Sequence, residues 1–229
     1  SPMFRAQVEL AELIDSVAQE GQGQSVVFDA DGTLWRGDVG EDFLRYGIHR
    51  RLFEADYRIY ESLLAQSPAT AYAYCVEVMA GQVEVELQRQ CAAFFARRYQ
   101  GRIFSFVRPL LAKLTSAGCS VWICSASPRW TVAPGASALG IPLQQVIGVT
   151  CPIVGGKLTG VVELPVPVGP SKVAWLKRCQ LAPALAVGNG DLDLYMLAFA
   201  QRAVVVSPPD SSNLLVQQAR ARRWPILRV

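Results

Sequence analysis

The sequence predicts an α/β fold, in which helices cover both faces of a parallel sheet and a block of helices is inserted into the chain. Three observations support this prediction. A short apolar run at 25–29 has the length of a buried strand. From residue 107 onward, further strand-like runs alternate with segments of helical periodicity. Between them, residues 40–106 are rich in Ala, Leu, Glu, Gln and Arg, which favour helix.

The elements follow in order along the chain. The first helix covers 4–20, where apolar residues recur at helical spacing, and the helical block has strong breaks at Ser67-Pro68 and Gly81. The later elements are a helix at 107–117, a strand at 120–125, a helix at 129–139, a strand at 145–149, a hairpin at 151–164, a helix from Ser171, a strand at 184–187, a helix from Asp191, a strand at 203–206 and a helix at 211–220. We therefore predict a Rossmann-like core of residues 1–38 and 107–229, with residues 39–106 as an inserted all-helical cap domain.

Composition excludes several classes of protein. Lys and Arg number 22 against 19 Asp and Glu, and this net charge of +3 is too small to indicate a nucleic-acid partner. No apolar stretch reaches the roughly 18 residues of a membrane span, and the first residues lack the apolar region of a signal peptide. The six cysteines form no C-x-x-C pair, so we expect buried reduced thiols. A cytoplasmic protein with no membrane partner is the expectation.

Polar residues gather at the predicted strand ends. Asp29 and Asp31 end the first strand, Ser125 ends the second, and residues 189–193 follow the strand at 184–187. Lys172 opens a helix between them. The carboxyl ends of parallel strands meet at one edge of a sheet, where α/β proteins bind their ligands. These residues are therefore expected to form one site.

The carboxylate pair in 28-FDADGTLW-35 is the feature of the sequence that says most about function. Side chains at Asp29 and Asp31 point the same way on an extended segment, and two like charges held close raise one another's pKa or recruit a cation. One carboxylate can then act as a nucleophile and the other as a general acid. The alternative is a solvated Asp-Gly turn.

Four motifs in order, namely FDADGT, SAS, the lysine at a helix start and GNGDLD, resemble those of the haloacid dehalogenase superfamily, in its phosphoserine-phosphatase-like branch (subfamily IB). The resemblance implies a phosphatase that uses Mg²⁺. Asp29 would attack phosphorus, Asp31 would be the general acid and base, Ser125 would bind a phosphoryl oxygen, and Lys172 would neutralise charge. Gly32, Thr33 and Ala126, which lie within these motifs, are expected beside the substrate.

The metal site departs from the family pattern. The metal ligands implied by the resemblance are Asp29, Asp31, Asn189 and Asp193, and Asn189 stands where the family usually has an aspartate. A neutral amide oxygen binds Mg²⁺ less strongly than a carboxylate does. Asn189 can ligate the metal directly, Asp191 or Asp193 can compensate, or the protein has lost most of its activity.

Three further residues have two interpretations each. In the family, an acidic residue near Asp38 or Glu41 meets the amino group of the substrate, although both also fit the first turn of a helix. Arg129 could reach a substrate anion or simply occupy the first turn of its helix. With His49 as the single histidine, Ser-His catalysis is close to excluded.

We expect hydrolysis of a small phosphorylated metabolite. The alternatives are a phosphoryl transferase or mutase on the same scaffold, and a weakly active or non-catalytic ligand-binding protein, which the Asn189 departure motivates. Carbon–halogen hydrolysis is disfavoured by Asp31, because a departing halide needs no proton donor.

Overall fold

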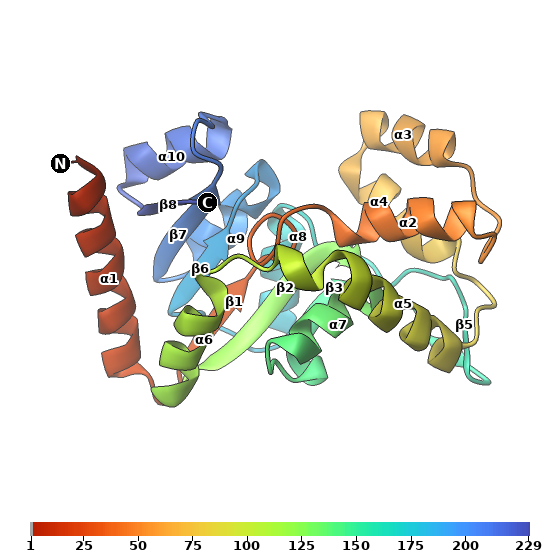
Figure 1. Cartoon of the computed structure of the whole chain (residues 1–229), viewed down its shortest axis with the longest axis horizontal. Helices are drawn as coiled ribbons and strands as arrows, with labels where there is room; N and C mark the ends of the chain where they lie inside the picture. The colour runs from red at the N-terminus through yellow and green to blue at the C-terminus, as the bar shows by residue number, and fades with distance from the viewer. Residues whose placement is uncertain (1) are drawn as a thin grey trace.

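A six-stranded parallel sheet forms the centre of the computed structural model, which describes residues 2–229 (Figure 1). Its strands are β1 (Ser25–Phe28), β2 (Ser120–Pro128), β3 (Val146–Val149), β6 (Leu185–Gly188), β7 (Arg202–Ser207) and β8 (Ile226–Arg228), in the order β3-β2-β1-β6-β7-β8. The two central strands are apolar because both of their faces are buried.

Helices cover both faces, as predicted. Val26 and Phe28 of β1 face the apolar side chains of α1 (Pro2–Glu20), α6 (Val107–Ser116) and α7 (Arg129–Ala138). Val27, which points the other way, packs with α8 (Pro170–Arg178), α9 (Leu194–Phe199) and α10 (Leu214–Arg222). The predicted Rossmann-like class is confirmed.

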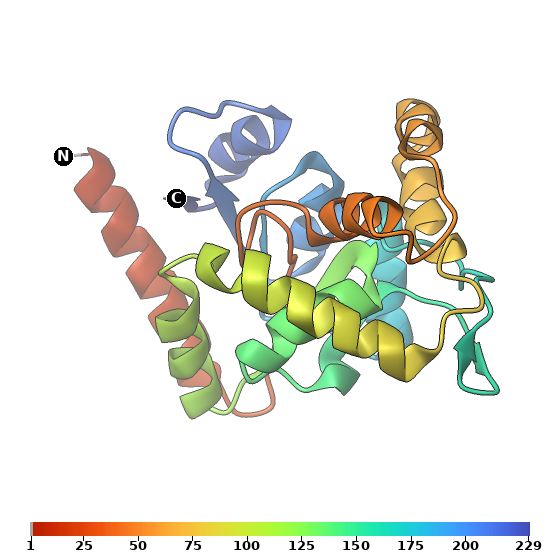
Figure 2. The ribbon, with the colours of Figure 1, turned by 45° about the vertical axis from the view of Figure 1, so that its right-hand side comes forward.

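Four helices stand between β1 and α6. They are α2 (Val39–His49), α3 (Tyr57–Gln66), α4 (Pro68–Glu77) and α5 (Glu84–Arg98), followed by a 3₁₀ turn at Gln100–Arg102. Figure 2 shows α5 running across α7. Buried residues of this segment join the same apolar core as β1, α6 and α7. Its role as a separate cap domain stays a prediction.

The observed elements correct the predicted ones in three places. The helical block breaks also at residues 50–56, and β2 runs three residues further than predicted, to Pro128. β8 was missed because it is a three-residue edge strand that contains Arg228. The hairpin is present but short, as β4 (Ile153–Val154) and β5 (Lys157–Leu158).

Three further observations within residues 2–229 concern the cysteines, the histidine and the helices. All six cysteines are free, and five of them are buried. His49 is exposed. None of the helices in this part of the chain combines the length with the apolar character that a membrane span needs.

Candidate active site

A pocket of about 220 Å³ opens at the carboxyl ends of β1, β2 and β6. It brings together most of the residues that the sequence pointed to. Its lining consists of Asp29, Asp31, Asp38, Tyr72, Ser125, Ala126, Ser127, Lys172 and residues 189–193. Tyr72 comes from α4 in the helical segment. Residues 125–127 belong to β2, Lys172 belongs to the first turn of α8, and the remaining residues follow β1 and β6.

Asp29 is held at the floor of this pocket. Its backbone N–H donates to the carbonyl oxygen of Val187 at 2.9 Å, which extends the β1–β6 ladder by one bond. Lys172 Nζ donates to Asp29 Oδ1 at 2.8 Å, and the Thr33 hydroxyl lies 3.2 Å from Asp29 Oδ2. Burial, together with the charge of Asp193, raises the pKa of Asp29 to about 6, against the opposing effect of Lys172. The carboxylate is therefore ionised at neutral pH.

The ammonium group of Lys172 donates three hydrogen bonds within the protein. Besides Asp29, its ammonium donates to Asp193 Oδ1 at 2.7 Å and to the carbonyl oxygen of Cys124 at 2.8 Å, and only 2% of the residue is exposed. Burial acts to lower the pKa of Lys172, but the charges of Asp193 and Asp29 outweigh it and raise that pKa above its ordinary value. Lys172 therefore stays charged and keeps Asp29 paired.

Asp31 has a different environment, without a cationic partner. Its Oδ1 accepts hydrogen bonds from Trp35 Nε1 at 2.8 Å and from the backbone N–H of Val39 at 2.9 Å. Its Oδ2 forms a short hydrogen bond with the Ser127 hydroxyl. Burial and the nearby charge of Asp38 raise the pKa of Asp31 well above its usual range. A proton on this carboxyl belongs on Oδ2, because Oδ1 already accepts two N–H groups.

Ser125 has a hydroxyl hydrogen available for a ligand. Its Oγ accepts the backbone N–H of Ser127 at 3.1 Å, and the residue is 1% exposed. Ala126 lines the same pocket. Ser127 and Trp35 are site residues that were not predicted, although the i, i+2 spacing of Ser125 and Ser127 in a strand places both side chains on the same face.

Asn189 approaches the two carboxylates through a position that only glycine allows. Gly32 has a φ of +77°, and a Cβ atom there would lie 2.2 Å from Asn189 Nδ2. The other amide atom of Asn189 lies 2.7 Å from Asp29 Oδ2 and 2.9 Å from the carbonyl oxygen of Asp31. If the amide nitrogen occupies that position, it donates hydrogen bonds to both oxygens. If the amide oxygen occupies it, three oxygens converge, from Asn189, from the Asp29 carboxylate and from the Asp31 carbonyl.

This oxygen set fits Mg²⁺. Oxygen ligands at about 2.1 Å around an octahedral Mg²⁺ lie roughly 3 Å from one another, which is close to the separations around Asn189. Within residues 2–229, no three His, Cys, Asp or Glu side chains are grouped as a metal site. Holding a cation here therefore requires the Asn189 amide and the Asp31 carbonyl beside Asp29.

Asp193, predicted as a metal ligand, is hydrogen-bonded through both of its carboxylate oxygens. Its Oδ1 is bound to Lys172, and its Oδ2 accepts the backbone N–H groups of Asn189 at 3.0 Å and Gly190 at 3.1 Å. These hydrogen bonds orient the loop, and the role of Asp193 as a metal ligand stays a prediction. Asp191 Oδ1 accepts the backbone N–H of Leu215, which ties the same loop to α10.

Four residues predicted to contact the substrate differ in where the structure places them. The Thr33 hydroxyl is hydrogen-bonded to Asp29 and, at 3.0 Å, to the side-chain amide of Asn189. The Gly32 N–H donates to the carbonyl oxygen of Trp35. Neither group is free for a ligand. Glu41 accepts the Tyr57 hydroxyl and lies outside the pocket lining. Asp38 remains in the lining, and it is also the N-cap of α2.

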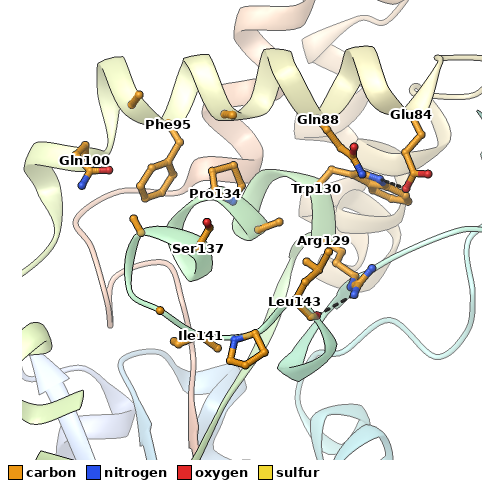
Figure 3. A pocket seen from close by; sticks show the side chains of 16 residues that line it. Glu84, Gln88, Phe95, Gln100, Arg129, Trp130, Pro134, Ser137, Ile141 and Leu143 are labelled. Atoms are coloured by element: carbon orange, nitrogen blue, oxygen red, sulfur yellow. Dashed lines mark hydrogen bonds between the residues drawn. The ribbon is translucent and has the colours of Figure 1, made fainter. Parts of the chain in front are cut away.

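Arg129 belongs to another groove, of about 840 Å³, between α5 and α7 (Figure 3). Its guanidinium donates to the carbonyl oxygens of Leu143 at 2.8 Å and Val146 at 3.2 Å. Glu84 is the one carboxylate of this lining, where it accepts the Trp130 N–H. The larger groove therefore offers no arrangement comparable to the pocket at the sheet edge.

Comparison with known proteins agrees with this geometry. The family model of haloacid dehalogenase-like hydrolases matches residues 26–198. A phosphoserine phosphatase of Halobacterium salinarum is 30% identical over 190 residues, which span 80% of this chain and 85% of that protein. This relationship confirms the prediction of a phosphatase-type enzyme.

Solved structures show the same fold. A Bordetella pertussis protein described as of unknown function superposes with a TM-score of 0.74 at 19% identity, over 89% of this chain and 98% of that chain. A phosphoserine phosphatase solved as a phospho-aspartyl intermediate analogue gives a TM-score of 0.57 at 15% identity, over 90% of this chain and 93% of that chain. The chain belongs to the haloacid dehalogenase-like hydrolases.

Proposed function

We propose that this protein hydrolyses a small phosphate monoester with Mg²⁺, through a phosphorylated Asp29. The observation that carries the proposal is the unequal surroundings of two neighbouring carboxyl groups. Lys172 pairs with Asp29, whereas Asp31 meets only neutral donors and lies near Asp38. Such a pair separates the role of an ionised nucleophile from that of a protonated acid.

In the first step, a carboxylate oxygen of Asp29 attacks phosphorus while the bond to the leaving alcohol breaks. Asp31 donates its Oδ2 proton to the leaving oxygen. In the second step, Asp31 takes a proton from water, whose oxygen attacks the phosphorus and releases phosphate from Asp29. The Ser125 hydroxyl and the Lys172 ammonium stabilise charge on the phosphoryl oxygens.

Asp29, the Asp31 carbonyl and Asn189 would hold Mg²⁺, which when bound neutralises charge on the phosphoryl group. The Asn189 amide contributes no charge, so the site is weaker than one built on a further carboxylate.

The helices α2–α5 are proposed to act as a cap over this site. Tyr72 from α4 lines the pocket. The pocket's small volume of about 220 Å³ favours a small metabolite over a macromolecule as substrate. The fold shared with a phosphoserine phosphatase solved as a phospho-aspartyl intermediate analogue supports the same chemistry.

The test is phosphate release from p-nitrophenyl phosphate with Mg²⁺, compared with an Asp29→Asn variant and with EDTA. Loss of the nucleophile is expected to lower kcat by roughly a thousandfold or more. No release from the wild-type protein with any divalent metal would overturn the hydrolase proposal and favour a non-catalytic binding protein. Phosphate that reaches an added alcohol instead of water would identify a transferase.

A further inference from the structure

The two carboxyl oxygens of Asp31 are held by different parts of the chain. Oδ1 accepts N–H groups from Trp35 and Val39, which both follow Asp31 within a few residues. Oδ2 is bound by the hydroxyl of Ser127 at 2.5 Å, from the end of β2, 96 residues further along the chain. Within residues 2–229, no second protein group is hydrogen-bonded to Oδ2. Ser127 therefore makes the one contact to the oxygen that carries the proton in the proposed mechanism.

The distances show which way the Ser127 hydroxyl points. Its oxygen lies 2.5 Å from Asp31 Oδ2 and 3.5 Å from Asp38 Oδ1, and the second distance exceeds the usual length of an O–H···O bond. The hydroxyl hydrogen therefore goes to Asp31. A carboxyl oxygen has two lone-pair directions, and a donor in one of them leaves the other for the acidic proton. Ser127 thus sets the side of Oδ2 on which that proton lies.

Neighbouring groups hold Ser127 itself in place. Its backbone N–H donates to the hydroxyl oxygen of Ser125 at 3.1 Å, which links it to the proposed phosphoryl contact. On another side lies Gly40, in the first turn of α2, where a Cβ atom would be 2.7 Å from the Ser127 hydroxyl oxygen. Only 7% of Ser127 is exposed, so its hydroxyl has little room to turn away. The position of this hydroxyl therefore depends on the lack of a side chain at Gly40.

We propose that Ser127 is a positioning residue, whose hydroxyl directs the Oδ2 proton of Asp31 towards the leaving oxygen in the space that Gly40 provides. The inference rests on the proposed phosphohydrolase function, because it assigns a partner to the proposed general acid. As the bond from phosphorus to the leaving oxygen breaks, its electron pair stays on that oxygen, which takes the proton from Asp31 Oδ2. Ser127 keeps its own hydrogen and donates it to the carboxylate that forms.

The dependence on the leaving group tests this role. Propyl phosphate needs a proton on its leaving oxygen, whereas p-nitrophenyl phosphate releases a weakly basic phenolate. In Ser127→Ala we expect kcat/KM for propyl phosphate to fall by about tenfold or more, the effect of losing a hydrogen bond to a charged group. The value for p-nitrophenyl phosphate should fall by less than about threefold, which also shows that the variant is folded. Gly40→Ala, whose Cβ displaces the Ser127 hydroxyl, should give the same selective loss.

Two control variants match these substitutions. Ser120→Ala removes a hydroxyl at the other end of β2 that accepts two side-chain N–H groups. Gly101→Ala places a Cβ where no other part of the described chain lies within 4 Å. Both controls should keep the wild-type ratio of the two kcat/KM values. In an Asp31→Asn background, Ser127→Ala should no longer change that ratio, because the two residues act as a unit.

Equal losses for both esters in Ser127→Ala, or a loss for neither, would overturn the positioning role and leave the phosphohydrolase function standing. A further selective loss on adding Ser127→Ala to Asp31→Asn would overturn it too, because Ser127 would then act without Asp31. An unchanged ratio in Gly40→Ala would overturn the part assigned to Gly40. Release of phosphate from neither ester by the wild-type protein, with any divalent metal, would overturn both proposals.

Discussion

At the scale of single residues, Asp29 and Asp31 show how two identical side chains acquire different chemical properties from their surroundings. The carboxylate of Asp29 shares the Lys172 ammonium with Asp193, whereas Asp31 receives N–H groups from Trp35 and from the start of α2. The proposed mechanism needs this difference, because a nucleophile must be ionised while a general acid must carry a proton.

Asp31→Asn removes the proton donor but keeps the shape and the acceptor oxygen of the side chain. We expect kcat for an alkyl phosphate to fall by roughly 10²- to 10³-fold. The fall should be much smaller for p-nitrophenyl phosphate, because its leaving group departs without a proton. Steady-state kinetics with both substrates measure the difference. An equal loss for both would contradict the role of Asp31 as general acid.

Asn189→Asp adds a charged oxygen to the proposed Mg²⁺ set. We expect the Mg²⁺ concentration for half-maximal activity to fall by about tenfold, because an anionic ligand binds a divalent cation more tightly than an amide does. Asn213→Asp is the matched control, since it adds the same charge at the N-cap of α10. An unchanged Mg²⁺ requirement in Asn189→Asp would show that Asn189 is not a metal ligand.

At the scale of elements, the loop between β1 and α2 sets the geometry of the site. The Asp31 carboxyl binds the Val39 N–H at the beginning of α2, and Gly40 in its first turn lies so close to Ser127 that a Cβ atom would be 2.7 Å from the hydroxyl oxygen. The loop, the second strand and the first helix of the inserted segment are thereby fixed to one another.

Gly32→Ala tests this geometry. Gly32 and Gly23 both have positive φ, at +77° and +82°, so an alanine at either position carries a similar backbone cost of about 1 kcal/mol. Only at Gly32 would the new Cβ collide with Asn189, because nothing lies within 4 Å at Gly23. We expect Gly32→Ala to lose more unfolding free energy than Gly23→Ala, because the collision adds to the shared backbone cost, and we expect it alone to lose phosphatase activity. Full activity of Gly32→Ala would contradict the close approach of Asn189.

At the scale of the whole molecule, the inserted helices and the sheet share one apolar core. The Trp35 ring lies edge-on to Phe95 of α5, with centroids 5.1 Å apart, and Trp35 also binds Asp31. Packing between the helical segment and the sheet layer therefore supports the residue that holds the proposed general acid.

Phe95→Ala should weaken this junction. We expect the free energy of unfolding to fall by about 3–5 kcal/mol, the range for truncation of a buried Phe, within a single cooperative transition. Denaturant titrations followed by tryptophan fluorescence and by circular dichroism measure it, and the two curves should coincide. Ile59→Ala on the half-exposed face of α3 should cost less than about 1 kcal/mol. Two separate transitions would show that residues 39–106 unfold as an independent domain.

Much of the fold is predictable because the central strands are buried on both faces. Their apolar runs, and the helical spacing between them, locate β1, β2, β6 and β7 to within a few residues. β8 is not predictable in this way, since a three-residue edge strand depends on its neighbour more than on its own residues.

The residues of the site likewise differ in how far the sequence predicts them. The local order of motifs predicted Asp29, Asp31, Ser125, Lys172 and Asn189, because strand ends in a parallel sheet meet at one edge. Other features depend on contacts between different segments of the folded chain. These are the hydrogen bonds of Ser127 with Asp31, of Lys172 with Asp193 and of Arg129 with Leu143. The hydrogen bond from Trp35 to Asp31 is local, but it depends on the folded conformation of the loop after β1.

The sequence by itself determined the fold class, the family resemblance and the residue types at the strand ends. Periodicity and motif order are local properties, so a single chain displays them. Only the tertiary structure decided which carboxylate has a cationic partner, which oxygens converge near Asn189 and which charges face the substrate. Pairing, burial and desolvation depend on what the folded chain places within a few ångströms of each group, and these set the proposed chemistry.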